Sequence, residues 1–501
     1  MKTNNSFLFF FVALSVMIMT SCESFLETLP DQRAEVNSVQ KVKDLLISAY
    51  PTLTPMIMEE MMSDNRMDNG DKFSFPMNMM IKSYRWQDIG ETDWDTPQEV
   101  WDACYIAIAS ANQALEAIEK LGNPPAASPY RGEALMCRAY GHFLLANTFC
   151  MSYGDKAAQH LGIPYIKKPE TTVDAVYTRG TLEQTYTDIN QDIEEGLPLI
   201  STEAYTIPLY HFNKRAAYAF ATRFNVFYRK YEKAIAYGIE ALGENPTPFL
   251  RNMDGYAQFP SSKEYTLRYI NKDDPANLML LATRSLWGRN YTNQRFGHNR
   301  YVCENLTIWS MGPWGRELGV YNKVLGYGDQ SIFVPKLDEM FEITNVVAQT
   351  GQPHVVAFAF TGDETLLCRA EAYVMTKQYD KAFQDLVYWY RIKMATQVPA
   401  SKEYVSSFYE QLSPQTNGMP LHPDFALEAG MQTNLLKAVL HARRIETVHE
   451  GGRWQDIKRF GVEVTHNLYN EESIILKPQD LRTAIQLPSN VVAAGLDRNP
   501  R

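Results

Sequence analysis

The sequence predicts a mostly α-helical protein in which helix hairpins form a scaffold and long, loop-rich insertions containing short strands interrupt it. Three observations support this fold class. Apolar residues recur at spacings of three and four over long stretches, as they do on one face of a helix. A short signature with Tyr, Lys and Ala repeats at three turns. Between these stretches lie segments rich in glycine and aromatic residues, where the helical period is lost.

The N-terminus has the layout of a bacterial lipoprotein signal. Lys2 supplies positive charge, an apolar run broken only by Ser15 extends from Phe7 to Met19, and small residues lead to Cys22. The run is too short to span a bilayer as a helix. We therefore predict that residues 1–21 are a signal peptide, that Cys22 is acylated and begins the mature chain, and that residues 22–35 are a tether. A secreted protein cut near Ser21 is the alternative.

The first two long helices are predicted to pair. Residues 97–121 form one helix, because Pro97 suits a first turn and the run Gly122-Asn123-Pro124-Pro125 ends it. Residues 130–150 form the next helix. Alanines on both apolar stripes allow close approach of the two axes, so we expect a hairpin.

Further hairpins are expected at 181–200 with 213–242, 363–376 with 380–393, and 434–450 with 453–460. The turn signature resembles the turn and second helix of a tetratricopeptide repeat, in which repeats follow one another every ~34 residues. It occurs as Tyr153-Gly154-Asp155-Lys156-Ala157, Tyr231-Glu232-Lys233-Ala234 and Tyr379-Asp380-Lys381-Ala382. The wide spacing predicts one domain over 22–501, with a scaffold at about 36–250 and 361–501 and a variable insertion at about 251–360.

The aromatic residues of the insertions are the candidate ligand-binding residues. Residues 281–335 hold nine aromatics and seven glycines, and 63–95 carry a smaller aromatic set. Trp and Tyr rings stack on the apolar faces of sugars, while polar side chains bind the hydroxyls. The predicted ligand-binding residues are Trp86, Trp287, Asn290, Tyr291, Trp309 and Trp314.

Composition and charge exclude several classes of protein. A hydrophobic content of 45% and a charged content of 21% are typical of a globular protein. The formal charge of −10 argues against a nucleic-acid partner, which needs a basic face. The cysteines after Cys22 form no CxxC pair, and four of them fall in helical patterns where free thiols pack as small apolar groups: Cys104, Cys137, Cys150 and Cys368.

The motifs of common enzymes are missing from the sequence. It contains no HExxH, GxSxG or phosphate-binding loop, and its nine histidines show no ligand spacing. We therefore expect no catalytic residues, no metal and no cofactor. Asp64, Asp68 and Asp71 do not fit the register of an EF-hand, although a looser calcium site there stays open.

Several stretches resemble the SusD/RagB family of Bacteroidetes outer-membrane lipoproteins. The resemblance covers the mature chain and is weakest in the middle insertion. It is carried by Arg131-Gly132-Glu133-Ala134-Leu135 with Arg138-Ala139-Tyr140, by Arg443-Arg444-Ile445-Glu446, by the run from Glu450-Gly451-Gly452-Arg453-Trp454 to Gly461, and by Gln486-Leu487-Pro488 with Asn499-Pro500. The chain departs from the family at its end, which lacks the usual Gly-Tyr.

The resemblance implies a non-catalytic surface protein, anchored by lipid in the outer membrane and facing the cell exterior. It would capture an oligosaccharide or another nutrient for a SusC-like TonB-dependent β-barrel transporter. Two alternatives stay open: a helical-repeat scaffold that binds only proteins or peptides, and a lipid-anchored glycoside hydrolase with two opposed carboxylates. The block from Arg443 to Gly461 also reads as a charge network that fixes the fold, in which Arg453 and Asp456 can pair across one helical turn.

Overall fold

A computed structural model describes residues 36–501 apart from 171–175, 260, 316–323 and 394–397. The described chain is mostly helical with a few short strands, which confirms the predicted fold class. The signal peptide, Cys22 and the tether lie outside the described residues. Within the described part, no helix has the length and apolar character needed to cross a bilayer.

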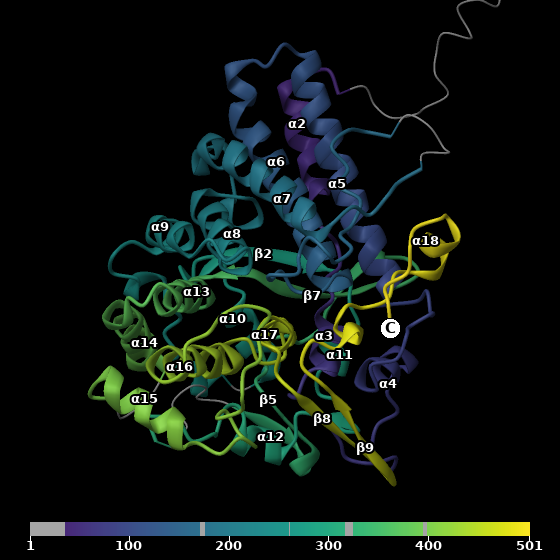
Figure 1. Ribbon diagram of the computed structural model, residues 1–501. Helices are drawn as coiled ribbons and strands as arrows, with labels where there is room; N and C mark the ends of the chain where they lie inside the picture. Colours follow the sequence, from purple (N-terminus) through teal and green to yellow (C-terminus); the bar gives the residue numbers. More distant parts are fainter. Residues whose placement is uncertain (1–35, 171–175, 260, 316–323, 394–397) are drawn as a thin grey trace, which may run out of the picture.

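The helices of the first half pack mainly against neighbours in the sequence, and the longest of them lie in the upper part of Figure 1. They are α2 (Val39–Leu46), α3 (Met56–Met62), α4 (Asn78–Tyr84), α5 (Pro97–Lys120), α6 (Ser128–Phe149), α7 (Leu182–Gly196), α8 (Lys214–Phe227) and α9 (Tyr231–Leu242). The expected hairpin of α5 and α6 is present, and Pro97 lies in the first turn of α5.

The expected pairing of 181–200 with a single helix over 213–242 is wrong. The second stretch breaks into α8 and α9, because Arg229 between them adopts a positive φ of 63° that no helix continues through. Helix α8 folds back on α9, and α7 packs against α6 instead.

Two of the three turn signatures begin a helix. Tyr231 starts α9, and Tyr379 starts α14 (Tyr379–Lys393). The stretch at Tyr153 does not, because its backbone is bound elsewhere: the N–H of Asp155 donates to the Asp424 carbonyl (2.9 Å), and the N–H of Lys156 donates to the Asp424 carboxylate (3.0 Å). That turn therefore holds the 424 loop and begins no repeat.

The middle insertion combines a small sheet with short elements. Strands β2 (Asn277–Thr283), β7 (Thr350–Thr361) and β6 (Met340–Asn345) form an antiparallel sheet in the order β2-β7-β6, and β2 and β7 cross the middle of Figure 1. The other elements are α10 (Ser262–Tyr269), α11 (Trp287–Asn290), β3 (Phe296–Gly297), α12 (Arg300–Asn305), β4 (Leu325–Tyr327) and β5 (Ser331–Phe333). Strand β3 pairs with β1 (Met67–Asp68), so the two insertions meet.

The last part of the chain closes the fold around α13. Its elements are α13 (Gly362–Met375), α15 (Lys402–Gln411), α16 (Met431–Glu446), α17 (Gly452–Phe460), the hairpin β8 (Val464–Leu468) with β9 (Glu471–Leu476), and α18 (Ser489–Ala493). Helix α13 packs against α8, α9, α14 and α16, which joins the two halves of the scaffold across the insertion. One apolar core draws on residues from Val42 to Leu487.

The C-terminal charge network exists, but its partners come from other elements. Arg443 binds Glu371 on α13 (2.6 Å) and Asp456 on α17 (2.7 Å). The expected pair of Arg453 with Asp456 is replaced by an ion pair of Arg453 with Asp64, because Asp64 enters from the loop after α3. The network therefore ties distant segments together. The helical cysteines are free and buried, as expected.

Candidate binding groove

Four of the six predicted binding residues are buried, and the expectation that the loops present their rings is wrong for these four. Trp86, Trp287, Tyr291 and Trp314 lie in the apolar core, and Trp287 is 1% exposed. A segment without helical periodicity must still bury apolar area, and large rings bury the most per residue. These rings therefore attach the insertions to the scaffold.

The polar atoms of three buried rings are satisfied inside the protein. The indole N–H of Trp287 donates to the His449 carbonyl (2.8 Å), and that of Trp86 donates to the Met62 carbonyl (3.0 Å). The Tyr291 hydroxyl donates to Asp338 (2.6 Å). Such pairing is what a buried Trp or Tyr needs to remain in a core, so these residues are structural.

Trp314 is held by contacts with other rings, and Asn290 is held by a hydrogen bond. The Trp314 ring lies 5.0 Å from the His441 ring and 5.3 Å from the Tyr390 ring, centroid to centroid. Half-buried Asn290 donates to the Leu286 carbonyl within its own helical turn (2.8 Å). Trp309 is half-buried, has the Arg300 guanidinium over its ring, and has no hydrogen-bond partner for its indole N–H among the described residues. Of the six, Trp309 remains a candidate at the surface.

A groove of about 730 Å³ lies between α12, the segment 414–422 and the β8–β9 hairpin. Helix α12 and the hairpin lie toward the bottom of Figure 1. Its volume is within the usual range for small-molecule sites. Asn299 caps α12 by accepting from the Val302 N–H (3.1 Å), and Val302 points inward. Tyr301 therefore points outward and is 48% exposed on the rim.

The groove combines an aromatic ring, an apolar surface and polar side chains. The apolar surface comes from Pro414, Met419 and Pro420. The polar side chains come from the 414–422 segment and from both strands of the hairpin: Gln415, His422, Thr465, Asn467 and Ser473. In β8 the burial alternates, so that His466 points inward and Thr465 outward. The Asn467 amide is bound inside the protein, since it accepts from the Tyr84 hydroxyl (3.0 Å) and donates to the Asp68 carbonyl (2.7 Å). The Tyr301 ring can stack on a sugar ring, and the exposed side chains of the other four polar residues can bind hydroxyls.

Asp64, in the lining of the groove, links the loop after α3 to α16 and α17. Its carboxylate accepts two hydrogen bonds from Arg453 (2.8 and 2.9 Å) and pairs with Arg444 (3.0 Å). Burial alone would raise the pKa of this carboxyl, but the two guanidinium groups hold the pKa well below its ordinary value. Asp64 therefore stays ionised and cannot serve as a general acid.

The described residues that line the groove form no catalytic constellation, and the following pair lies outside that lining. A serine–histidine pair exists, with the Ser310 hydroxyl 2.7 Å from His441 Nε2, but Ser310 is 2% exposed and donates to the Thr307 carbonyl. Burial lowers the pKa of His441 to about 3. Within the described ranges, no three His, Cys, Asp or Glu residues are grouped to hold a metal.

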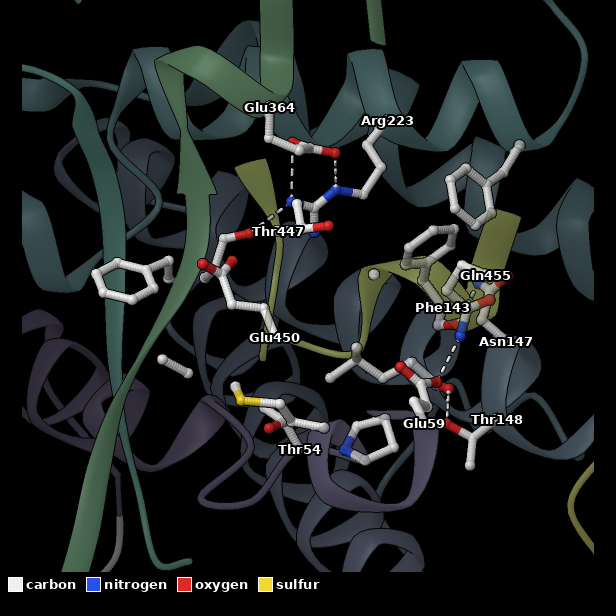
Figure 2. Close-up of a pocket in the computed structure, with 18 of the residues that line it drawn as sticks. Thr54, Glu59, Phe143, Asn147, Thr148, Arg223, Glu364, Thr447, Glu450 and Gln455 are labelled. Atoms are coloured by element: carbon white, nitrogen blue, oxygen red, sulfur yellow. Dashed lines mark hydrogen bonds and ion pairs between the residues drawn. The ribbon is translucent and has the colours of Figure 1, made fainter. Parts of the chain in front are cut away.

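A second hollow lies between α3, α6, α8, α17 and β7 (Figure 2). It measures about 150 Å³ and is lined by side chains of several helices and β7, including Glu59, Phe143 and Gln455. Arg223 and Glu364 form a salt bridge across one side of it (2.9 Å). Burial raises the pKa of Glu59 to about 7. The volume is below the range of ligand sites for anything as large as an oligosaccharide, so the surface groove is the stronger candidate.

Comparison with known proteins gives one family. Residues 24–226 match a SusD-like family described as starch-binding and associating with the outer membrane. The SusD-like protein P38 of Formosa agariphila is 26% identical over 249 residues, which is 46% of this chain and 44% of that protein. The match thus spans less than half the length of that curated relative.

Solved structures share the fold over nearly the whole chain. A putative sugar-binding protein of Bacteroides vulgatus superposes with a TM-score of 0.65 at 17% identity, covering 93% of this chain and 99% of the other. A SusD superfamily protein of Bacteroides thetaiotaomicron has a TM-score of 0.60 at 17% identity, covering 93% and 100%. At these identities the likeness concerns the fold alone.

Proposed function

We propose that this chain belongs to the SusD/RagB family and that it binds an oligosaccharide at the outer membrane, with the groove beside Tyr301 as the binding site. The observation that carries the proposal is the composition of the groove. An exposed ring stands beside an apolar surface and a row of hydroxyl and amide groups, which match the alternating faces of a pyranose.

The proposal extends to how the protein acts. Acylated at Cys22 and facing the exterior, it holds the oligosaccharide without cleaving it and passes it to a SusC-like TonB-dependent barrel. The non-catalytic role is supported by the state of the carboxylates: Asp64, one of the two acids of the groove, is held ionised by Arg444 and Arg453. A glycosidase needs one carboxyl that carries a proton.

The test is calorimetric titration of the full chain in detergent with malto-, cello-, xylo- and manno-hexaose. We expect one of them to bind and Tyr301→Ala to weaken binding about tenfold, which corresponds to ~1.4 kcal/mol. Tyr210→Ala is the matched control, because Tyr210 is 46% exposed but does not line the groove. Equal binding by wild type and Tyr301→Ala contradicts the placement of the site.

A role in binding a protein is favoured by one separate observation. A groove of about 550 Å³ between α5 and α18 is largely apolar, with Trp101, Ile108 and Leu496 in its lining. If this surface meets the barrel, Leu496→Asp should reduce co-purification of the barrel and leave oligosaccharide binding unchanged. Loss of sugar binding in the same variant would contradict this assignment.

A further inference from the structure

The charges of the groove discriminate between classes of oligosaccharide. Its described lining contains two carboxylates, Asp64 and Glu463, and one guanidinium, Arg66. Glu463 is exposed at the start of β8, whereas the Arg66 side chain is fully buried. The surface that a ligand would meet is therefore acidic or neutral.

Arg66 is directed into the protein. One guanidinium nitrogen donates to the Tyr291 carbonyl (2.8 Å), and the guanidinium carbon lies 4.9 Å from the centre of the Trp287 ring. The other nitrogen faces His449 Nδ1 (3.4 Å) and Glu60 (3.5 Å). The Arg66 guanidinium therefore interacts with buried groups and does not reach a ligand in the groove.

The cationic side chains of the neighbouring elements also form ion pairs with acidic residues of the protein. Arg444 and Arg453 share Asp64. Arg300, next to Tyr301, pairs with Asp329 (2.7 Å) and Glu304 (3.1 Å). Arg295 pairs with Asp68 (3.3 Å).

The same holds behind the groove. Lys437 of α16 donates to the Gly418 carbonyl (2.8 Å) in the segment that forms one wall. Arg85 binds Glu471 on β9 (2.9 Å). A bound uronate or sulfate needs an Arg or Lys that can reach it, and the described lining presents none that is exposed.

From this arrangement we infer that the groove takes neutral oligosaccharides and rejects those that carry uronate or sulfate groups. The Asp64 charge is already balanced by Arg444 and Arg453, so the exposed negative charge that an anionic sugar would approach is Glu463. The described lining offers no exposed counter-charge, and like charges at a binding surface cost affinity. A neutral sugar meets no such repulsion. The Tyr301 ring can stack on it, and Gln415, Thr465 and Ser473 can bind its hydroxyls. The inference rests on the proposed function of the groove.

The experiment compares two panels on the full chain in detergent by calorimetry at pH 8 and low salt. The neutral panel is maltohexaose, cellohexaose, xylohexaose, mannohexaose and N-acetylchitohexaose. The anionic panel is hexagalacturonate, hexamannuronate and a heparin hexasaccharide. We expect a neutral hexasaccharide to bind at least tenfold more tightly than any anionic one, and Tyr301→Ala to weaken it.

A charge reversal tests the cause. Glu463→Lys should tighten binding of hexagalacturonate about fivefold, because it replaces the exposed negative charge of the groove with a positive one. Glu472→Lys is the control, because Glu472 is exposed on the same hairpin but outside the groove lining. Tyr301-dependent binding of an anionic hexasaccharide as tight as the best neutral one overturns the charge inference and leaves the proposed function standing. Binding of neither panel overturns both.

Discussion

Asp64 shows how one residue can shape a site without acting in it. Its carboxylate is shared by two guanidinium groups, one from α16 and one from α17, and it comes from the loop after α3. The Arg444 and Arg453 side chains are almost wholly buried. Removing the acid would leave two buried cations without a counter-charge, which costs far more than the loss of a surface ion pair.

We expect Asp64→Asn to lower the free energy of unfolding by about 3–5 kcal/mol at pH 7, measured by urea unfolding. The folded-state pKa of Asp64 lies below the ordinary value near ~3.9, so its contribution is fully present above that pH and is lost as the pH falls toward the folded pKa. The difference between wild type and variant should therefore narrow by ~1 kcal/mol between pH 5 and pH 3.

Glu463→Gln is the control for this prediction, because Glu463 belongs to the same groove and is exposed. It should change stability by less than about 0.5 kcal/mol. A loss for Asp64→Asn that stays constant with pH would mean that the carboxylate charge is not its source.

At the scale of elements, the start of α13 depends on the absence of a side chain. Gly362 is the first residue of the helix, and its N–H donates to the Ala276 carbonyl at the edge of β2 (2.9 Å). A Cβ on Gly362 would lie 1.9 Å from the Phe249 carbonyl oxygen. The close approach lets α13 begin where the sheet ends.

Gly362→Ala should therefore destabilise the fold by ~2 kcal/mol or more, because a backbone carbonyl cannot move aside as a flexible side chain can. The measurement is the urea midpoint of unfolding. Gly90→Ala is the matched control: nothing lies within 4 Å of a Cβ there, and no unusual backbone angle is involved. Equal midpoints for the two variants would show that the backbone around Phe249 moves to make room for the Cβ.

The helices were predictable because their signal is local, and the site was not because its signal is tertiary. Helices α5, α6 and α13 follow from apolar spacing and end signals within each segment. The aromatic segments contain large rings that either bind or fill a core, and only the fold decides. The exposure of Tyr301 could have been predicted from the spacing of apolar residues around α12. Val302, Cys303 and Leu306 mark the buried face, which leaves Tyr301 on the other side.

At the scale of the whole molecule, the C-terminal segment is hydrogen-bonded to the end of α6 and to Arg179. The buried Asn499 side chain accepts from Arg179 (2.8 Å) and donates to the Phe149 carbonyl at the end of α6 (2.9 Å) and to the Ile485 carbonyl (2.7 Å). Its backbone exchanges hydrogen bonds with the Gln486 side chain. These bonds join the C-terminal segment to Arg179 and to the end of α6.

Asn499→Ala tests whether this closure stabilises the entire fold. The substitution removes the hydrogen bond to the buried Ile485 carbonyl. It also takes one bond each from Arg179 and the Phe149 carbonyl, which stay bonded to each other (3.3 Å). A buried group left unsatisfied costs about 1–3 kcal/mol, so we expect a loss of ~2 kcal/mol in urea unfolding. Arg498→Ala next to it removes only an exposed ion pair with Asp88 and should cost less than about 0.5 kcal/mol. If the closure acts only locally, Asn499→Ala will leave the main unfolding transition in place and speed amide hydrogen exchange after residue 480 alone. If it acts globally, exchange will also rise in α6, because the last carbonyl of that helix loses one of its two side-chain hydrogen bonds.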